Sequence, residues 1–152
     1  MYNKKDIIKK IVEVAQQRKE GHIPSSLSIL DIMYVIYRDY VVPGKGRFVL
    51  SKGHASLGLY AIMDHFGILE EDMFNFCKFD SKLGGHPSCR VNGVECSTGS
   101  LGHGMPFALG LAMSEKILGT SKKVIAIIGD GESNEGTIWE SALIASHHSV
   151  HN

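Results

Sequence analysis

The sequence lacks the features that mark several large classes of protein. No apolar run approaches the ~20 residues that a membrane-spanning helix needs, which argues against a membrane protein. Neither charge is in excess, since 16 Lys and Arg residues balance 16 Asp and Glu residues. A general electrostatic attraction to nucleic acid or to an anionic membrane is therefore not expected.

Cysteine is equally scarce. Cys77, Cys89 and Cys96 form neither the even framework of a disulfide-rich protein nor a closely spaced metal-binding pair. We interpret them as free thiols in a reducing compartment. The chain does have the 43% hydrophobic and 21% charged content of a soluble globular protein, so a cytoplasmic location is expected.

Alternating helix and strand patterns predict the α/β class. The 152 residues are enough for one domain with its own core. Short apolar runs at residues 47–50 and 123–129 are typical of strands, and the second run is continuous, as in a strand buried on both faces. The segments between and around them predict helices, over residues 4–19, 27–37, 57–63, 69–79, 101–118 and 138–148. We therefore expect a parallel sheet flanked by helices.

The second predicted helix and one long loop carry further expectations. Ser25 and Ser26 should cap the helix over residues 27–37, after the break at residues 21–24. The apolar residues of this helix are nearly continuous, which predicts that most of its surface is buried. Residues 80–99 show little regular pattern, and a loop of that length inside a compact domain is usually functional.

The strongest chemical signal follows the second predicted strand. Asp130 stands between Gly129 and Gly131 at the carboxyl end of that strand, the edge where open parallel sheets bind ligands. Glycines let a phosphate approach the backbone, whose N–H groups can hold it. A carboxylate can share such a phosphate through a cation, and Mg²⁺ accepts oxygens from both. The alternative is a tight Gly-Asp-Gly turn without a ligand.

Several histidines occupy glycine-flanked or turn positions. His22, His54 and His86 would suit proton transfer near neutral pH. Any one of them taken alone would more often be a hydrogen-bonded structural residue. We interpret the histidines without such a context as surface or structural, namely His65, His147, His148 and His151. Lys52, beside His54, could meet a phosphate or remain solvated.

Four blocks of the sequence resemble transketolases in their order and spacing. The blocks are residues 21–28 (Gly-His-Ile-Pro-Ser-Ser-Leu-Ser), 50–55 (Leu-Ser-Lys-Gly-His-Ala), 84–87 with 97–104, and 129–136 (Gly-Asp-Gly-Glu-Ser-Asn-Glu-Gly). The last block is similar to the diphosphate-binding motif of that family. The resemblance runs from about residue 5 to the end of the chain, so a chance match is the poorer explanation.

The resemblance implies a binding site for thiamine diphosphate and Mg²⁺. It assigns Asp130 to the metal ion, and it assigns His54 and the Gly131 backbone to the diphosphate. The aminopyrimidine ring of the cofactor would meet the backbone groups of one turn, formed by Gly99, Ser100 and Leu101.

The resemblance also implies transfer of a two-carbon ketol unit between a ketose and an aldose, with sugar phosphates as substrates. Cleavage beside a ketone leaves a carbanion, for which the thiazolium ring of the cofactor is the electron sink. His22, His86 and His103 would line the path to that ring and hold the oxygens of the sugar. Glu135, also implied near the cofactor, and Glu140 match carboxylates that help to link the two active sites of a dimer.

The family pattern continues beyond this sequence. It places a further strand, ending in an Asn that completes the Mg²⁺ shell, after the helix that follows Asp130. The sequence ends at Asn152, 22 residues after Asp130 (152 − 130), and no apolar strand precedes Asn152, so we do not assign it as that ligand. We expect residues 1–152 to be the N-terminal part of a transketolase-like diphosphate-binding domain that is inactive alone.

Three interpretations of this length stay open. The sequence could be part of a longer single-chain enzyme, or a true short subunit whose site is completed by a C-terminal transketolase subunit. It could instead be a non-catalytic remnant that forms dimers or binds a partner through the helices around Trp139. Ser100 and His103 resemble the two-subunit type more than the long single-chain type.

Overall fold

Two short parallel strands stand at the centre of the structure, a computed structural model that describes residues 3–152. Strand β1 (Gly46–Leu50) pairs with β2 (Lys123–Ile127) so that Leu50 lies opposite Ile127. The α-helices of the described chain are α1 (Lys4–Arg18), α2 (Ile23–Leu27), α3 (Leu30–Ile36), α4 (Ser56–His65), α5 (Gly104–Ile117) and α6 (Gly136–His147).

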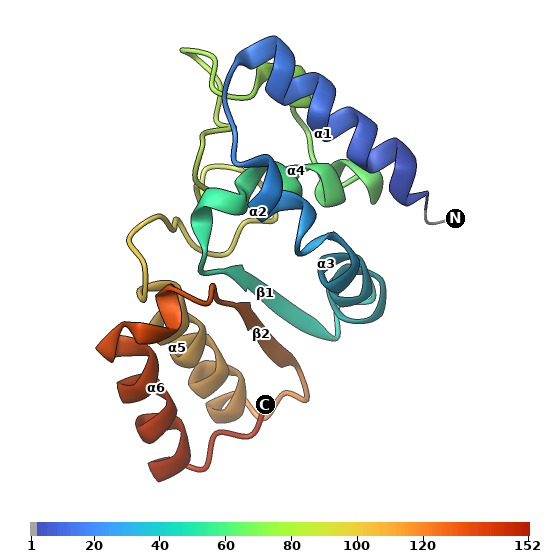
Figure 1. The fold of residues 1–152 in the computed structure, drawn as a ribbon. Coiled ribbons are helices and arrows are strands. Elements are labelled where there is room, and N and C mark those ends of the chain that lie inside the picture. Colours follow the sequence, from blue (N-terminus) through green and yellow to red (C-terminus); the bar gives the residue numbers. More distant parts are fainter. Residues whose placement is uncertain (1–2) are drawn as a thin grey trace.

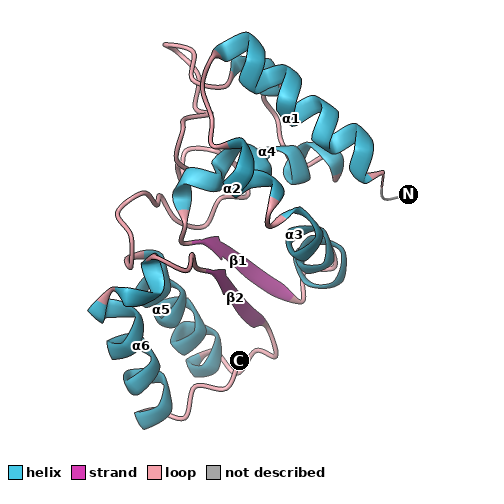
Figure 2. Ribbon diagram, in the orientation of Figure 1, coloured by secondary structure: helices cyan, strands magenta, loops and turns pink. Residues whose placement is uncertain are grey.

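Helices cover both faces of this sheet (Figure 1; Figure 2). Helices α3 and α4 lie on one side and α5 and α6 on the other, while α1 packs against α4. On the first side, Phe48 and Leu50 of β1 join a buried cluster that includes Ile11, Leu30 and Ile62. The predicted fold, a parallel sheet flanked by helices, is confirmed. Within residues 3–152, none of the helices has the length and apolar character needed to cross a bilayer.

The predicted helix over residues 27–37 begins later, as α3 at Leu30, and a separate short helix, α2, forms where a break was expected. Helix α2 begins before Pro24, because proline fits the first turn of a helix, where its missing N–H has no partner to lose. Ser25 and Ser26 therefore lie inside α2 and do not cap the next helix. The expected burial of this region is also wrong in part, because Ile32 of α3 is 55% exposed.

The helix predicted over residues 69–79 does not form, so that prediction is wrong. Among the described residues of that segment, a single 3₁₀ turn forms, at Met73–Asn75. The Asp72 carboxylate accepts a hydrogen bond from the Phe74 N–H at 3.0 Å, which offers the backbone an alternative to helix. The chain then places Phe76 in the core, where it is 1% exposed.

The irregular segment predicted over residues 80–99 is present and continues to the start of α5. Thr98 attaches its end to β1, because Thr98 Oγ1 donates to the Leu50 carbonyl at 2.7 Å. The Thr98 N–H donates to the Pro87 carbonyl at 3.2 Å, so residues 87 and 98 of the loop lie side by side.

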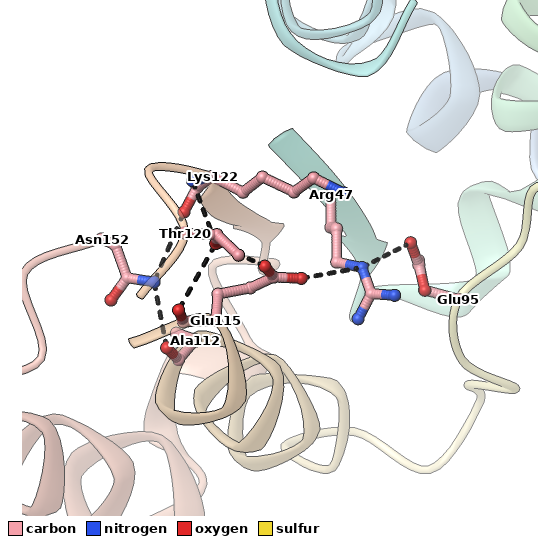
Figure 3. Close-up of polar contacts among 7 residues, drawn as sticks. All are labelled: Arg47, Glu95, Ala112, Glu115, Thr120, Lys122 and Asn152. Atoms are coloured by element: carbon pink, nitrogen blue, oxygen red, sulfur yellow. Dashed lines mark hydrogen bonds and ion pairs between the residues drawn. The ribbon is translucent and has the colours of Figure 1, made fainter. Parts of the chain in front are cut away.

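Strand β2 is less buried than its apolar sequence predicted. Its residues from Val124 onward are half-buried, and β1 pairs with one edge of the strand only. At the other edge, the Val124 N–H donates to the Asn152 carbonyl at 2.9 Å. Asn152 Nδ2 donates in turn to the Ala112 carbonyl of α5 at 2.9 Å (Figure 3). Asn152 therefore lies at the start of β2, whereas Asp130 follows its opposite end.

A buried carboxylate joins α5 to β1 (Figure 3). Glu115 of α5 is 5% exposed, and its Oε2 accepts a hydrogen bond from Thr120 Oγ1 at 2.5 Å. Glu115 Oε1 lies 3.5 Å from Arg47 Nε of β1. The same Nε lies 3.3 Å from Glu95 Oε1, so one guanidinium connects the strand, the helix and the long loop.

Replacing Glu115 by Gln should lower the free energy of unfolding by about 1–3 kcal/mol, because it removes the buried charge that faces Arg47. Glu95→Gln is the matched control and should cost less than about 1 kcal/mol, because that side chain is 31% exposed and water screens the pair. Urea denaturation of both variants measures the difference. Equal losses in the two variants would contradict the buried role of Glu115.

Candidate functional site

The carboxyl ends of β1 and β2 open into a cleft of about 360 Å³. Lys52 and His54 enter it from the segment after β1, and Asp130 and Gly131 from the segment after β2. Leu101 lines it from the loop before α5. Four of the predicted site residues thus line one cleft, because parallel strands release the chain at the same edge of the sheet.

Close backbone approach fixes the loop beside this cleft. A Cβ on Gly53 would lie 2.8 Å from Thr98 Oγ1 and 3.0 Å from the Gly99 nitrogen, so a larger residue does not fit without a shift. A Cβ on Gly104 would lie 2.6 Å from the Ser51 Cα. The loop therefore packs against the chain that leaves β1 both before and after the turn at residues 99–101.

Three of the predicted histidines meet at this edge. The rings of His22 and His54 lie 5.5 Å apart, centroid to centroid, in an edge-to-face arrangement. His86 packs its ring against Gly99, where an added Cβ would lie 3.2 Å from the ring. The pKa of His54 is lowered from its ordinary value, first by burial and then by the positive charges of Lys52 and the two neighbouring histidines. His54 is therefore neutral over a wider pH range than a solvated imidazole.

The other six predicted residues do not line the cleft itself: His22, His86 and Gly99 pack beside it, and the remaining three lie further out. His103 is exposed at the start of α5, with its Nδ1 3.1 Å from the Leu101 carbonyl oxygen. Glu135 is exposed at the start of α6 and packs against Gly102, where an added Cβ would lie 2.8 Å from the Glu135 Cβ. Ser100 is also exposed. These residues lie at the rim, and the cleft itself does not include them.

Asp130 presents an exposed side chain next to the open backbone of Gly131. Its carboxylate has no hydrogen-bond or ion-pair partner among residues 3–152. A Cβ on Gly131 would meet nothing within 4 Å, which leaves space over the backbone for a phosphate. The described residues contain no group of three His, Cys, Asp or Glu side chains arranged for a metal ion. Asp130 can therefore hold a cation only together with oxygens from a ligand or from other groups.

The sequence left the role of Lys52 open and did not single out Glu132. Lys52 is only 9% exposed and lines the cleft, so it is not the solvated lysine that its sequence position left open. Glu132 is 1% exposed and accepts hydrogen bonds from the backbone of Gly102 and Gly129. Its one signal in the sequence is its place after Gly131, which does not distinguish it from an exposed acidic residue.

A larger hollow, of about 620 Å³, lies beside His22 between α1 and residues 20–23. Its walls include Val12, Ala15 and the stems of polar side chains of α1. We place the chemistry in the smaller cleft, because charged groups and open glycine backbone meet there.

Comparison with known proteins gives a consistent result. A family model described as "Transketolase, thiamine diphosphate binding domain" matches residues 5–152. The chain is 36% identical over 153 residues to an apulose-4-phosphate transketolase subunit of Phocaeicola vulgatus, covering 95% of this chain and 54% of that protein. It is 41% identical over 142 residues to transketolase-like protein 2 of Mus musculus, covering 87% of this chain and 23% of that protein.

A solved structure agrees with the sequence matches. The transketolase from Campylobacter jejuni aligns with a TM-score of 0.81 and 28% identity, covering 97% of this chain and 26% of that one. The chain spans about half of the length of the apulose-4-phosphate transketolase relative and about a quarter of the longer relatives.

Lys52→Met should raise the pKa of His54, because it removes a positive charge that disfavours the imidazolium form. The wild-type imidazole should titrate below 6.5, its ordinary pKa. The unfolded chain therefore binds this proton more readily than the folded chain does. The free energy of unfolding should accordingly rise as the pH increases from the lowered pKa of His54 to 6.5. NMR titration of the His54 ring measures this pKa in the wild-type chain and in Lys52→Met. Lys82→Met, at an exposed lysine, is the control, and an equal effect of the two substitutions would contradict the assignment.

Proposed function

Because this chain belongs to the transketolase family, through the thiamine diphosphate binding domain that residues 5–152 match, we propose that it holds thiamine diphosphate and Mg²⁺ in an enzyme that transfers ketol units. The observation that carries the proposal is the meeting of Asp130 and Gly131 with Lys52 and His54 in one cleft.

The residues of the cleft fit the diphosphate end of such a cofactor. The unpartnered Asp130 carboxylate suits Mg²⁺, which would share oxygens between that carboxylate and the phosphates. The open backbone at Gly131 leaves room for a phosphate. The Lys52 ammonium and the imidazole of His54 face the same space and would offset the remaining negative charge of the phosphates.

The substrate side of the proposal rests on the histidines. The thiazolium ring supplies the electron sink when a bond beside a ketone is cleaved. A neutral imidazole can donate one hydrogen bond and accept another, and we assign this role at the sugar oxygens to His22 and His86, beside His54. His103, at the rim, is assigned to the sugar further from the ring. Ketose and aldose phosphates are the proposed substrates, in keeping with the sugar phosphate in the names of two relatives.

The proposed enzyme needs more than residues 1–152. We propose that a C-terminal transketolase subunit, or further chain, supplies the second protein ligand of Mg²⁺ and the pyrimidine side of the site. Two matched relatives are named as single subunits of a transketolase, which supports this proposal. Glu135 is assigned to the region where such a neighbour would meet the cofactor. Ketol transfer by residues 1–152 alone is not expected.

The exposed face of α6 is the proposed subunit interface. Trp139, Leu143 and Ile144 are 64%, 71% and 46% exposed, and Phe107 of the adjacent α5 is 41% exposed. Several large apolar side chains gathered on two neighbouring helices are typical of a surface that another protein covers. This face also supports the second candidate function, a non-catalytic dimerisation module, from which cofactor binding would distinguish the enzyme.

Calorimetric titration with thiamine diphosphate in excess Mg²⁺ tests the proposed function. The wild-type chain should bind, and Asp130→Ala should abolish detectable binding, because the phosphates then lose the cation that offsets their charge. Asp80→Ala, at an exposed aspartate outside the cleft, is the control and should bind like wild type. A folded wild-type chain that binds no cofactor would overturn the proposal that residues 1–152 hold the cofactor by themselves, and would leave either a fragment of the enzyme or the dimerisation module.

Leu143→Glu should weaken self-association or binding to a partner chain by about 30-fold or more, which corresponds to the ~2 kcal/mol typical of a central interface residue. Sedimentation velocity over a range of concentrations measures the change. Phe79→Glu, at a fully exposed loop residue away from α6, should have no effect. Association that is insensitive to Leu143→Glu would place the interface elsewhere.

A further inference from the structure

Glu132 is a buried carboxylate in the wall of the cleft, and its oxygens are occupied by donors of the protein. It is 1% exposed, and its two oxygens accept three hydrogen bonds. Oε1 accepts from Ser51 Oγ at 2.5 Å and from the Gly102 N–H at 2.8 Å, and Oε2 accepts from the Gly129 N–H at 3.0 Å.

These three donors belong to the three segments that build the cleft. Ser51 directly precedes Lys52, Gly102 directly follows the turn at residues 99–101, and Gly129 directly precedes Asp130. The partners Ser51 and Gly102 are 81 and 30 residues away from Glu132 in the sequence. One side chain therefore links the ends of both strands to the loop between them.

The peptide groups of Gly102 are held from two directions. Its N–H donates to Glu132, and its carbonyl accepts a hydrogen bond from Thr137 Oγ1 at 2.8 Å. Gly102 has a φ of 83°, and an added Cβ would lie 2.5 Å from Thr137 Oγ1, so the backbone has little freedom to move there. The preceding turn is thus fixed relative to Glu132 and the start of α6.

We propose that Glu132 is a positioning residue that sets the spacing between the Asp130–Gly131 turn and the turn at residues 99–101, and so lets one cofactor reach both. The inference rests on the proposed function, in which these turns hold the diphosphate and the aminopyrimidine ring. Burying a carboxylate is unfavourable unless its oxygens are fully hydrogen-bonded, and here its partners are backbone groups of the site itself.

A glutamine at this position cannot make the same contacts. The amide of Gln has one accepting oxygen and one NH₂ group, which donates only. If the NH₂ group faces Gly129, that N–H loses its acceptor, and if it faces Ser51 and Gly102, the Gly102 N–H loses its acceptor. Glu132→Gln therefore releases one of the two turns while keeping the size of the side chain.

The test compares Glu132→Gln with Glu115→Gln, because both glutamates are buried and Glu115 lies near the opposite end of the sheet. Calorimetric titration with thiamine diphosphate and Mg²⁺ is made at a temperature where both variants are folded by circular dichroism. Glu132→Gln should lose affinity by about tenfold or more, as for residues that orient a ligand-binding group. Glu115→Gln should bind like wild type. Equal affinities in the two variants would overturn the proposal.

A second readout needs no cofactor. In ¹⁵N-labelled protein, the amide proton of Gly102 or Gly129 should move upfield in Glu132→Gln, because its hydrogen bond to a charged oxygen is lost. Both resonances should keep their positions in Glu115→Gln. If the wild-type chain binds no cofactor, the proposed function fails. The positions of these two amide resonances then test by themselves whether Glu132 holds the two turns. Unchanged Gly102 and Gly129 resonances in Glu132→Gln would overturn it.

Thr137→Val covers the case in which Glu132→Gln does not fold. This variant keeps the shape of the side chain and removes the hydrogen bond to the Gly102 carbonyl. It should weaken cofactor binding about fivefold, the equivalent of one ordinary hydrogen bond. Wild-type affinity in Thr137→Val would show that the fixed position of Gly102 does not matter for binding and would overturn the proposal.

Discussion

The parallel register of β1 and β2 is the constraint on which the rest of the site depends. With Leu50 opposite Ile127, the chain leaves both strands at the same level, and the Ser51 N–H continues the ladder by donating to the Ile127 carbonyl at 2.9 Å. A slip of one residue would turn every side chain of a strand to the opposite face. It would also move the segment of Lys52 and His54 away from that of Asp130.

Elements with a clear hydrophobic period could be predicted from the sequence, and so could the meeting of His54 and Asp130, because each follows a strand of one parallel sheet. The division between α2 and α3 could not, because Pro24 starts a helix as readily as it ends one. The 3₁₀ turn in place of a helix at residues 69–79 has Asp72 as its N-cap, and nothing in the apolar spacing of this segment limits the turn to three residues. Glu132 escaped prediction because its partners lie far away in the sequence, where no local pattern reports them.

Two carboxylates that are two positions apart have opposite environments. Glu132 is buried and its oxygens are occupied by donors of the protein, so it has little capacity left for a ligand. Asp130 is exposed and keeps its oxygens available. The short 3₁₀ turn at Glu132–Asn134 separates these two roles, since it directs one side chain inward and leaves the other at the open end of β2.

The distance between the two strands along the chain has a consequence for how the molecule folds. Gly46 pairs with Lys123, a separation of 77 positions (123 − 46), whereas the contacts of α1 and α3 with α4 join residues that are closer in sequence. Closing a long loop is entropically unfavourable until the distant contacts form, so nearby helices assemble sooner than remote strands. We therefore expect the N-terminal helices to form the surface against which β2 packs at a later stage of folding. The carboxyl-terminal edge of the sheet, which carries the cleft, should then be among the last parts of the molecule to fold.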